Sequence, residues 1–242
     1  MTRDAPEAAA RALVAQRYPA AIQAWLAGST TTGRATETSD LDITVLLDEG
    51  SDGVEVHRES LEYDGWPVEL FVHTEASIEH FVAKDLQRRH PTMARLVATG
   101  VALLGDGGEH VRRHCEGVLA RGPMPVEPDD LELMRYGLTD LLDDLAGASG
   151  PESTAVAISV WRATAELALA ARGAWQGTGK WLVRELRELD ARDGTQLTED
   201  LDHSVRQALT GDPAPLTAVA DDVLGRCGGR FWSGLYRAAE LT

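Results

Sequence analysis

The chain of 242 residues has only two cysteines, Cys115 and Cys227, which lie far apart and lack metal-ligand spacing. Two such cysteines fit reduced intracellular thiols better than a disulfide framework or a zinc site. The seven histidines form no HExxH motif or similar grouping, so the sequence predicts no zinc centre. No apolar stretch approaches the length of a membrane span, and the N-terminus lacks the apolar segment of a secretory signal. These features predict a cytoplasmic protein without membrane contacts.

Basic residues are also scarce. The chain has 39 acidic and 23 basic residues, a formal net charge of −16, and no basic run. Because nucleic-acid binding depends on neutralising phosphates with Lys and Arg, a long polynucleotide substrate is disfavoured. A cationic small molecule would be attracted to such a surface, although solubility alone also accounts for the acidity.

The first half of the chain alternates between helical and strand-like patterns. Helical spacing of apolar residues, including Trp25, predicts a helix over residues 6–26 that Pro19 interrupts or kinks. A second helix is expected over residues 77–98, with a break at Pro91. Strands are expected at Leu41–Leu47, around Val54–Leu61, at Pro67–His73 and at Val101–Leu104, with Asp64-Gly65 as a hairpin turn and Gly105–Gly108 closing the unit. This order predicts an α+β domain on one mixed sheet, over residues 1–121.

A proline cluster at residues 122–128 marks the expected linker, and strand patterns end there. The second half, residues 122–242, is expected to form an all-α helical bundle. Its first helix carries an apolar stripe, and a nearly all-apolar helix follows at Ala155–Arg172. The stripe consists of Leu131, Met134, Leu138, Leu141 and Leu145, and shorter helices are expected at Trp181–Leu189, Glu199–Leu209, Ala214–Cys227 and Phe231–Ala239.

Two aspartates open the strand at Leu41–Leu47. Because strand side chains alternate between faces, Asp40 and Asp42 share one face, while Leu41 and Ile43 share the other. Two carboxylates that project together repel each other unless a cation lies between them. Mg²⁺ is the expected cation, because it binds through one or two carboxylates plus substrate phosphates. A solvent-facing strand with alternating acids is the competing interpretation, but Asp42 sits in an otherwise apolar run that requires compensation.

Gly28-Ser29 precedes this strand by about ten residues. Glycine lets a phosphate approach the backbone, and Ser29 supplies a hydroxyl and an N–H donor, so the pair is expected where the chain turns into a helix. Alone, such a dipeptide is most often a simple turn. Its spacing from Asp40 and Asp42 is what favours a phosphate-binding role.

A third carboxylate is expected from a neighbouring strand. Glu69 interrupts the apolar strand Pro67–His73, with Phe71 and His73 on its side. Glu69 would bind metal or accept the proton of an acceptor hydroxyl, and the sequence leaves both roles open. Glu62 is a weaker rival because it lies near a turn without an apolar frame.

Together, Gly28-Ser29, Asp40-Leu41-Asp42 and the isolated Glu69 resemble the DNA polymerase beta-like nucleotidyltransferase superfamily. The start at Ser39-Asp40 and the segment Thr99–Gly105 are similar to its minimal bacterial members, and the recognisable motifs span residues 20–106. The following helical domain makes the layout similar to aminoglycoside adenylyltransferases of the kanamycin and streptomycin/spectinomycin types. Minimal members often carry Ala-Arg before the second glycine. Here Thr31-Thr32 precede Gly33, and Arg34 is expected to supply that positive charge.

The resemblance implies that Asp40, Asp42 and Glu69 hold two Mg²⁺ ions and that Gly28, Ser29 and Arg34 contact the phosphates of ATP or another nucleoside triphosphate. An acceptor hydroxyl would attack the α-phosphorus in line, and pyrophosphate would leave. The helical domain would then form a substrate-binding wall. A small hydroxylated, cationic acceptor, an aminoglycoside first, follows from the layout and acidity, and would make the protein an antibiotic-resistance enzyme.

Several residues of the second half have two open interpretations. Lys180, which follows Gly177-Thr178-Gly179 at a helix start, and Arg184 one turn later would reach the phosphates, or belong to a flexible interhelical loop. Glu166 either pairs with Arg162 four residues before it or acts as a general base. Acids that lie off the leucine stripe either are solvated or suit a polyamine-like acceptor; these are Asp140, Asp143 and Asp144. Trp175 and Trp181 belong to the core or stack on a base.

Two alternatives to a small-molecule transferase remain. One is transfer of AMP onto a protein, as in antitoxins of the minimal nucleotidyltransferase type. The other is a nucleotide-binding regulator without turnover, against which the complete carboxylate set argues. The sequence leaves the oligomeric state open.

Overall fold

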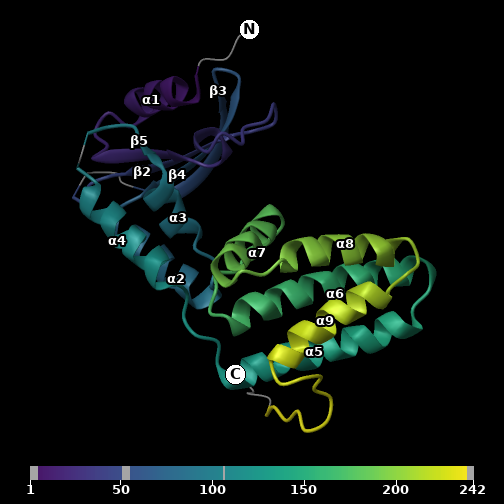
Figure 1. The fold of residues 1–242 in the computed structure, drawn as a ribbon. Coiled ribbons are helices and arrows are strands. Elements are labelled where there is room, and N and C mark those ends of the chain that lie inside the picture. The colour runs from purple at the N-terminus through teal and green to yellow at the C-terminus, as the bar shows by residue number, and fades with distance from the viewer. Residues whose placement is uncertain (1–4, 51–54, 106, 239–242) are drawn as a thin grey trace. The chain divides into compact units, whose positions relative to one another are not determined.

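The computed structural model describes residues 5–50, 55–105 and 107–238. The chain divides into two compact units, Met1–Pro123 and Met124–Thr242. The first unit contains the described strands together with four α-helices, and the second is helical (Figure 1). The predicted fold class, an α+β domain on a mixed sheet followed by a helical region, is confirmed.

One five-stranded sheet forms the centre of the first unit, with strand order β3-β4-β2-β1-β5. The pairing of β2 with β4 is parallel, and the other pairings are antiparallel, so the sheet is mixed. The strands are β1 (Gln23–Ala27), β2 (Leu41–Leu46), β3 (His57–Tyr63), β4 (Trp66–His73) and β5 (Val101–Ala102).

Helices cover both faces of this sheet (Figure 1). Alternation places Leu41, Ile43 and Val45 of β2 on the face that packs against α1. On the opposite face, α3 packs on β1 and β2, and Phe81 of α2 contacts His73 of β4. The helices are α1 (Pro6–Arg17), α2 (Glu75–Arg88), α3 (Thr92–Thr99) and α4 (Glu109–Arg121).

The hairpin between β3 and β4 turns at Asp64-Gly65, as predicted. Both turn residues have positive φ, 49° for Asp64 and 73° for Gly65, as the favoured two-residue hairpin turn requires. The predicted strand around Val54–Leu61 begins at His57, and Val54 lies outside the described residues. The break expected at Pro91 is also present, since it separates α2 from α3.

The prediction of one helix over residues 6–26 is wrong. The helix ends at Arg17, and Gln23–Ala27 forms strand β1. Pro19 disfavours helical backbone at Tyr18, where the helix ends. All five residues of β1 are buried, because the strand lies inside the sheet between two helical layers. A short strand buried on both faces has no period-two pattern, so the apolar residues up to Trp25 have the spacing of a helix although β1 is a strand.

Gly105–Gly108 does not close the first unit, because helix α4 follows and its Val111, Cys115 and Val118 are buried. The expected linker at residues 122–128 spans the border between the two units.

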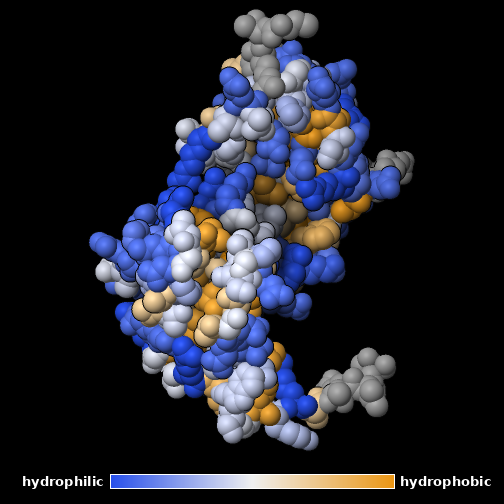
Figure 2. Space-filling model, turned by 90° about the vertical axis from the view of Figure 1, so that its right-hand side faces the viewer, coloured by the Kyte–Doolittle hydropathy of each residue, from blue (hydrophilic) through white to orange (hydrophobic). Residues whose placement is uncertain are grey.

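The second unit contains α5 (Pro128–Gly147), α6 (Gly150–Ala171), α7 (Lys180–Asp193), α8 (Leu197–Leu209) and α9 (Ala214–Arg226). The apolar stripe of α5 and the buried face of α6 share one hydrophobic core. Hydrophobic side chains also reach the surface of this unit, where Figure 2 shows a band of them between hydrophilic neighbours. Exposed large ones in this unit include Ile158 and Leu209.

The helix predicted at Phe231–Ala239 is wrong for residues 231–238, which form a non-helical segment; Ala239 lies outside the described residues. Side-chain and backbone contacts hold the segment on other parts of the unit. Arg230 pairs with Asp221 and Asp143, and the backbone N–H of Phe231 donates to Thr139. Gly234 has a φ of 105°, which helical backbone excludes.

The statement that no stretch approaches a membrane span also needs correction. Among the described residues, α6 is long and apolar enough to cross a membrane by length and composition, with a mean hydropathy of 1.2. The core helix of a soluble protein passes the same test, and 44% of the apolar window is buried inside the structure. The length and hydropathy of α6 therefore do not distinguish a membrane span from a core helix.

Candidate functional site

Three carboxylates meet where β2 begins. Asp40, Asp42 and Glu69 each place one oxygen within 4.8 Å of the others, and each side chain is half-buried. The parallel pairing of β2 and β4 produces this arrangement, because Asp42 lies directly opposite Glu69 in the register. Asp40 precedes Asp42 by two residues and therefore lies on the same face. Among the described residues, this is the one group of three or more candidate metal ligands.

Gly28 closes this group from the side of β1. It directly follows Ala27, which pairs with Asp42, and it has a φ of 84° and a ψ of −158°, a conformation open in practice only to glycine. A Cβ at this position would collide with the carboxylate of Asp42. The glycine therefore gives the backbone close access to the carboxylate group, and the following 3₁₀ turn Ser29–Thr31 begins at its edge.

A hydrogen-bonded loop links the turn to the carboxylates. The hydroxyls of Ser29 and Ser39 lie 2.8 Å apart, and Ser39 Oγ also accepts from the backbone N–H of Thr36 at 2.9 Å. Ser39 is 7% exposed, so these bonds fix the loop just before Asp40. The backbone N–H of Arg34 donates to the Ser29 carbonyl, and the Arg34 side chain is exposed on the same loop.

Arg58 is a residue of this region that the sequence analysis missed. Its Nη2 donates to both carboxylate oxygens of Glu69 at 2.7 Å, and its guanidinium carbon lies 5.1 Å from the ring centroid of Phe71. The register of the β3–β4 hairpin pairs Arg58 with Phe71, which places it on the face that carries Glu69. The predicted hairpin turn could have indicated this contact. Pairing the residues before the turn with those after it places Arg58 opposite Phe71.

The candidates of the helical unit occupy separate positions on their helices. Lys180 is the first residue of α7, and the Arg184 guanidinium stacks 4.5 Å from the ring centroid of Trp181. Glu166 pairs with Arg162 at 2.6 Å, which confirms the predicted ion pair. Asp143 pairs with Arg230, and Trp175 is buried. A phosphate contact by Lys180 or Arg184 stays a prediction.

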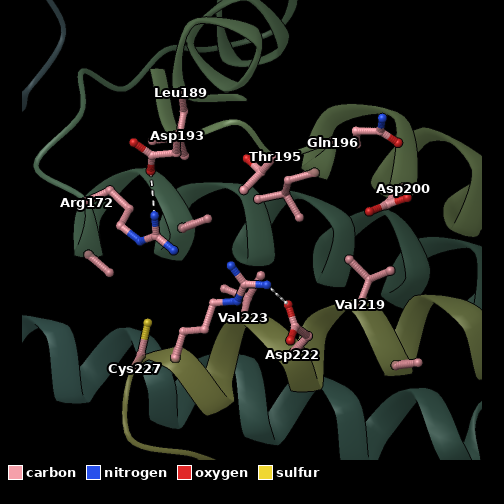
Figure 3. Close-up of a pocket in the computed structure, with 15 residues that line it drawn as sticks. Arg172, Leu189, Asp193, Thr195, Gln196, Asp200, Val219, Asp222, Val223 and Cys227 are labelled. Atoms are coloured by element: carbon pink, nitrogen blue, oxygen red, sulfur yellow. Dashed lines mark hydrogen bonds and ion pairs between the residues drawn. The ribbon is translucent and has the colours of Figure 1, made fainter. Parts of the chain in front are cut away.

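A cavity of about 440 Å³ lies within the helical unit (Figure 3). Its floor is mostly apolar, with Leu189, Val219 and Val223 among its lining residues. Four of the charged side chains that line it form two ion pairs, Arg172 with Asp193 at 2.5 Å and Arg226 with Asp222 at 2.9 Å. Asp200 also lines the cavity.

Three carboxylates at the start of the central strand β2, beside a glycine that admits no side chain, define a site suited to metal-bound phosphates. The comparison with protein families agrees with this geometry: residues 9–100 match the nucleotidyltransferase domain. The first unit thus carries a nucleotidyltransferase domain of the polymerase beta-like type, as the motifs predicted. The general activity that such a domain supports is transfer of a nucleoside monophosphate from a nucleoside triphosphate.

A search of solved structures returns a nucleotidyltransferase-like protein from Exiguobacterium sibiricum 255-15, whose crystal structure has a resolution of 1.90 Å. The two chains are 16% identical, and the match covers 92% of this chain and 77% of that one with a TM-score of 0.42. No curated protein matches the chain.

Proposed function

We propose that this protein transfers AMP from ATP, or the corresponding group from another nucleoside triphosphate, to a hydroxyl of a small acceptor with the help of divalent metal. The observation that carries the proposal is the convergence of Asp40, Asp42 and Glu69 beside Gly28, within a domain that matches the nucleotidyltransferase family.

The donor set fits Mg²⁺ better than a softer metal. Three carboxylates supply only hard oxygen ligands, and no described histidine or cysteine joins the group. The half-buried position also suits an ion that keeps part of its coordination for substrate phosphates. Asp40, Asp42 and Glu69 would hold the ions, which when bound neutralise charge on the α-phosphate and the departing pyrophosphate.

The residues around the carboxylates have distinct tasks in the transfer. Gly28 admits a phosphate to the backbone, and the N–H and hydroxyl of Ser29 bind its oxygens. The acceptor oxygen forms a bond to the α-phosphorus, the bond from that phosphorus to the bridging oxygen breaks, and pyrophosphate leaves. The acceptor proton passes to Glu69 or to solvent, and both routes stay open.

The nature of the acceptor is the least constrained part of the proposal. An aminoglycoside, predicted from the acidity and the layout, stays a prediction, as do a protein acceptor and a regulator without turnover. The role of the helical unit as a substrate-binding wall stays a prediction as well.

The test is mass spectrometry of candidate acceptors incubated with the protein, ATP and Mg²⁺. We expect an adduct one AMP heavier, together with pyrophosphate, in the wild-type reaction and in an Asp48→Asn control. Asp48 is an exposed carboxylate just beyond β2, outside the carboxylate group. Asp42→Asn should abolish the adduct. An adduct of equal yield from Asp42→Asn would contradict the proposed site.

A further inference from the structure

A second cavity of about 440 Å³ lies in the first unit, on the sheet face that carries Glu69. Phe71 follows Glu69 by two residues on β4 and lines this cavity, as does Arg58, which binds the Glu69 carboxylate. Phe81 of α2 and Met93 and Leu96 of α3 form the opposite wall. An aromatic and apolar cavity therefore lies beside Arg58, which binds the third carboxylate of the candidate site.

The order of the strands indicates from which side of the carboxylates an acceptor would enter. Gly28 approaches Asp42 from the side of β1, whereas Glu69 approaches it from the side of β4. In-line displacement at phosphorus requires the leaving group and the nucleophile on opposite sides of that atom. If Gly28 and Ser29 hold the departing phosphates, the acceptor enters from the side of Glu69. The cavity behind Arg58 and Phe71 lies on that side.

The exposed charged side chains that line the cavity are two arginines, which pair with Glu69 and Asp85 and keep further N–H donors. Arg58 and Arg88 line the cavity, and the side chain of each is 62% exposed. Both hydrogen bonds from Arg58 to Glu69 use Nη2, and the guanidinium carries further N–H donors on Nη1 and Nε. Lys84 adds a third cation near the rim, with its Nζ 5.4 Å from the Phe81 ring centroid.

Asp85, the carboxylate among the lining residues, is buried and pairs with Arg88. Asp85 is 1% exposed, and its oxygens accept from the backbone N–H of Met93 at 2.6 Å and from Arg88 at 2.9 Å. It thus caps α3 from inside the fold. His73 also lines the cavity, and burial, with a smaller contribution from His57, lowers its pKa to about 4, so its ring is neutral at pH 7.

We infer that this cavity is the acceptor site of the proposed transfer and that it takes a hydroxylated molecule with a planar apolar body and an anionic group. The body stacks between Phe71 and Phe81. The anionic group pairs with Arg58 or Arg88 through charge-assisted hydrogen bonds. That the bound molecule is an acceptor rests on the proposed function, whereas the binding preference follows from the cavity alone. It disfavours a polycation such as an aminoglycoside at this position.

A pair of probes with the same ring and opposite charge tests the preference. These are 4-hydroxyphenylacetate and tyramine, titrated into the full chain with isotope-labelled methionine methyl groups. Met93 lines the cavity, and Met124 and Met134 of the other unit serve as internal references. We expect 4-hydroxyphenylacetate to shift the Met93 signal and to bind about tenfold more tightly than tyramine, because only the anion gains a charge-assisted bond.

A variant that fills the cavity confirms the position. Leu96 is half-buried at the wall, so Leu96→Trp should occupy the space and abolish the Met93 shift. Val101→Trp, on the exposed edge strand β5 at the other end of the sheet, should leave it unchanged. Equal or tighter binding of tyramine, a Met93 shift with kanamycin instead, or a shift that survives Leu96→Trp would overturn the inference. Because the titration needs neither ATP nor metal, its failure is distinct from failure of Asp42→Asn to abolish nucleotidyl transfer.

Discussion

Gly28 lies against the carboxylate of Asp42, so closely that a Cβ on Gly28 would stand 3.2 Å from Asp42 Cγ and would collide with the nearer carboxylate oxygen. The two residues come from neighbouring strands, since Gly28 follows the pairing of Ala27 with Asp42. The proposed phosphate-binding turn and the proposed metal ligand are thus parts of one small structure, and a change in either should displace the other.

Gly28→Ala should reduce nucleotidyl transfer about 100-fold, because the new methyl group moves Asp42 by a fraction of an ångström or more. Gly33→Ala is the matched control. Gly33 also has a positive φ, 68°, but no atom outside its neighbours lies within 4 Å of a Cβ there. Gly33→Ala should lose about 1 kcal/mol of stability from backbone strain. Gly28→Ala should lose more, because its backbone conformation is open in practice only to glycine and the new Cβ meets Asp42. Similar activities of the two, measured as the initial rate of pyrophosphate release, would show that the clash has no catalytic consequence.

His73 should make the stability of the first unit depend on pH. Burial lowers its pKa from the ordinary 6.5 to about 4, so between these values the unfolded chain binds a proton that the folded chain does not. Stability therefore falls as the pH decreases from 6.5 to 4, by at most about 3 kcal/mol for this group. Urea unfolding over this range should show a smaller slope in His73→Gln than in the wild type. The exposed residue His114 provides the control variant His114→Gln, and an equal slope in all three proteins would rule out the assignment.

Asp190 should be a stabilising cap in the helical unit. It accepts from the backbone N–H groups of Leu197 and Thr198 at the start of α8 and from the hydroxyls of Thr195 and Thr198. Burial opposes its ionisation, but these bonds outweigh burial and lower its pKa. Asp190→Ala should cost about 2 kcal/mol in urea unfolding. Glu188→Ala, an exposed change on the same helix, should cost less than about 0.5 kcal/mol. A cost for Asp190→Ala no larger than that of Glu188→Ala would contradict the cap.

The two cysteines should differ in reactivity. Burial raises the pKa of the Cys115 thiol to about 12, and its side chain is fully buried between the helices of the first unit. Cys227 is half-buried, and burial raises its pKa as well. A thiol reagent at pH 8 should label Cys227 slowly in the folded protein and Cys115 only after unfolding. Labelling of folded Cys227→Ser would show that the first unit opens.

The sequence was sufficient for the elements whose patterns are local. Strands β2 and β4, the hairpin turn at Asp64-Gly65 and the helix break at Pro91 each have a local signal, and all are present. The sequence did not predict strand β1, because burial on both faces removed the alternation of polar and apolar residues. The helix predicted after Arg230 was wrong, because long-range ion pairs and a glycine with positive φ decide the conformation of that segment.

The candidate site also has one part that local spacing predicts and one part that depends on long-range strand pairing. The spacing of Asp40 and Asp42 on one strand places them on one face, and the isolated Glu69 marks the neighbouring strand. That Glu69 lies directly opposite Asp42 depends on a parallel register, which links residues 27 positions apart and which neither strand encodes alone. The contact of Arg58 with Glu69 depends on a second register, and the cavity beside it on the packing of α2 and α3.

The most direct test of the account is a Mn²⁺ titration followed by electron paramagnetic resonance, with a non-hydrolysable ATP analogue present and no acceptor required. The account predicts that the wild type and Asp48→Asn bind two Mn²⁺ ions with the nucleotide. It also predicts that Asp42→Asn and Glu69→Gln weaken binding about 100-fold or more, because each loses an anionic ligand. Unchanged Mn²⁺ affinity in Asp42→Asn would contradict the central claim that these carboxylates form the metal site.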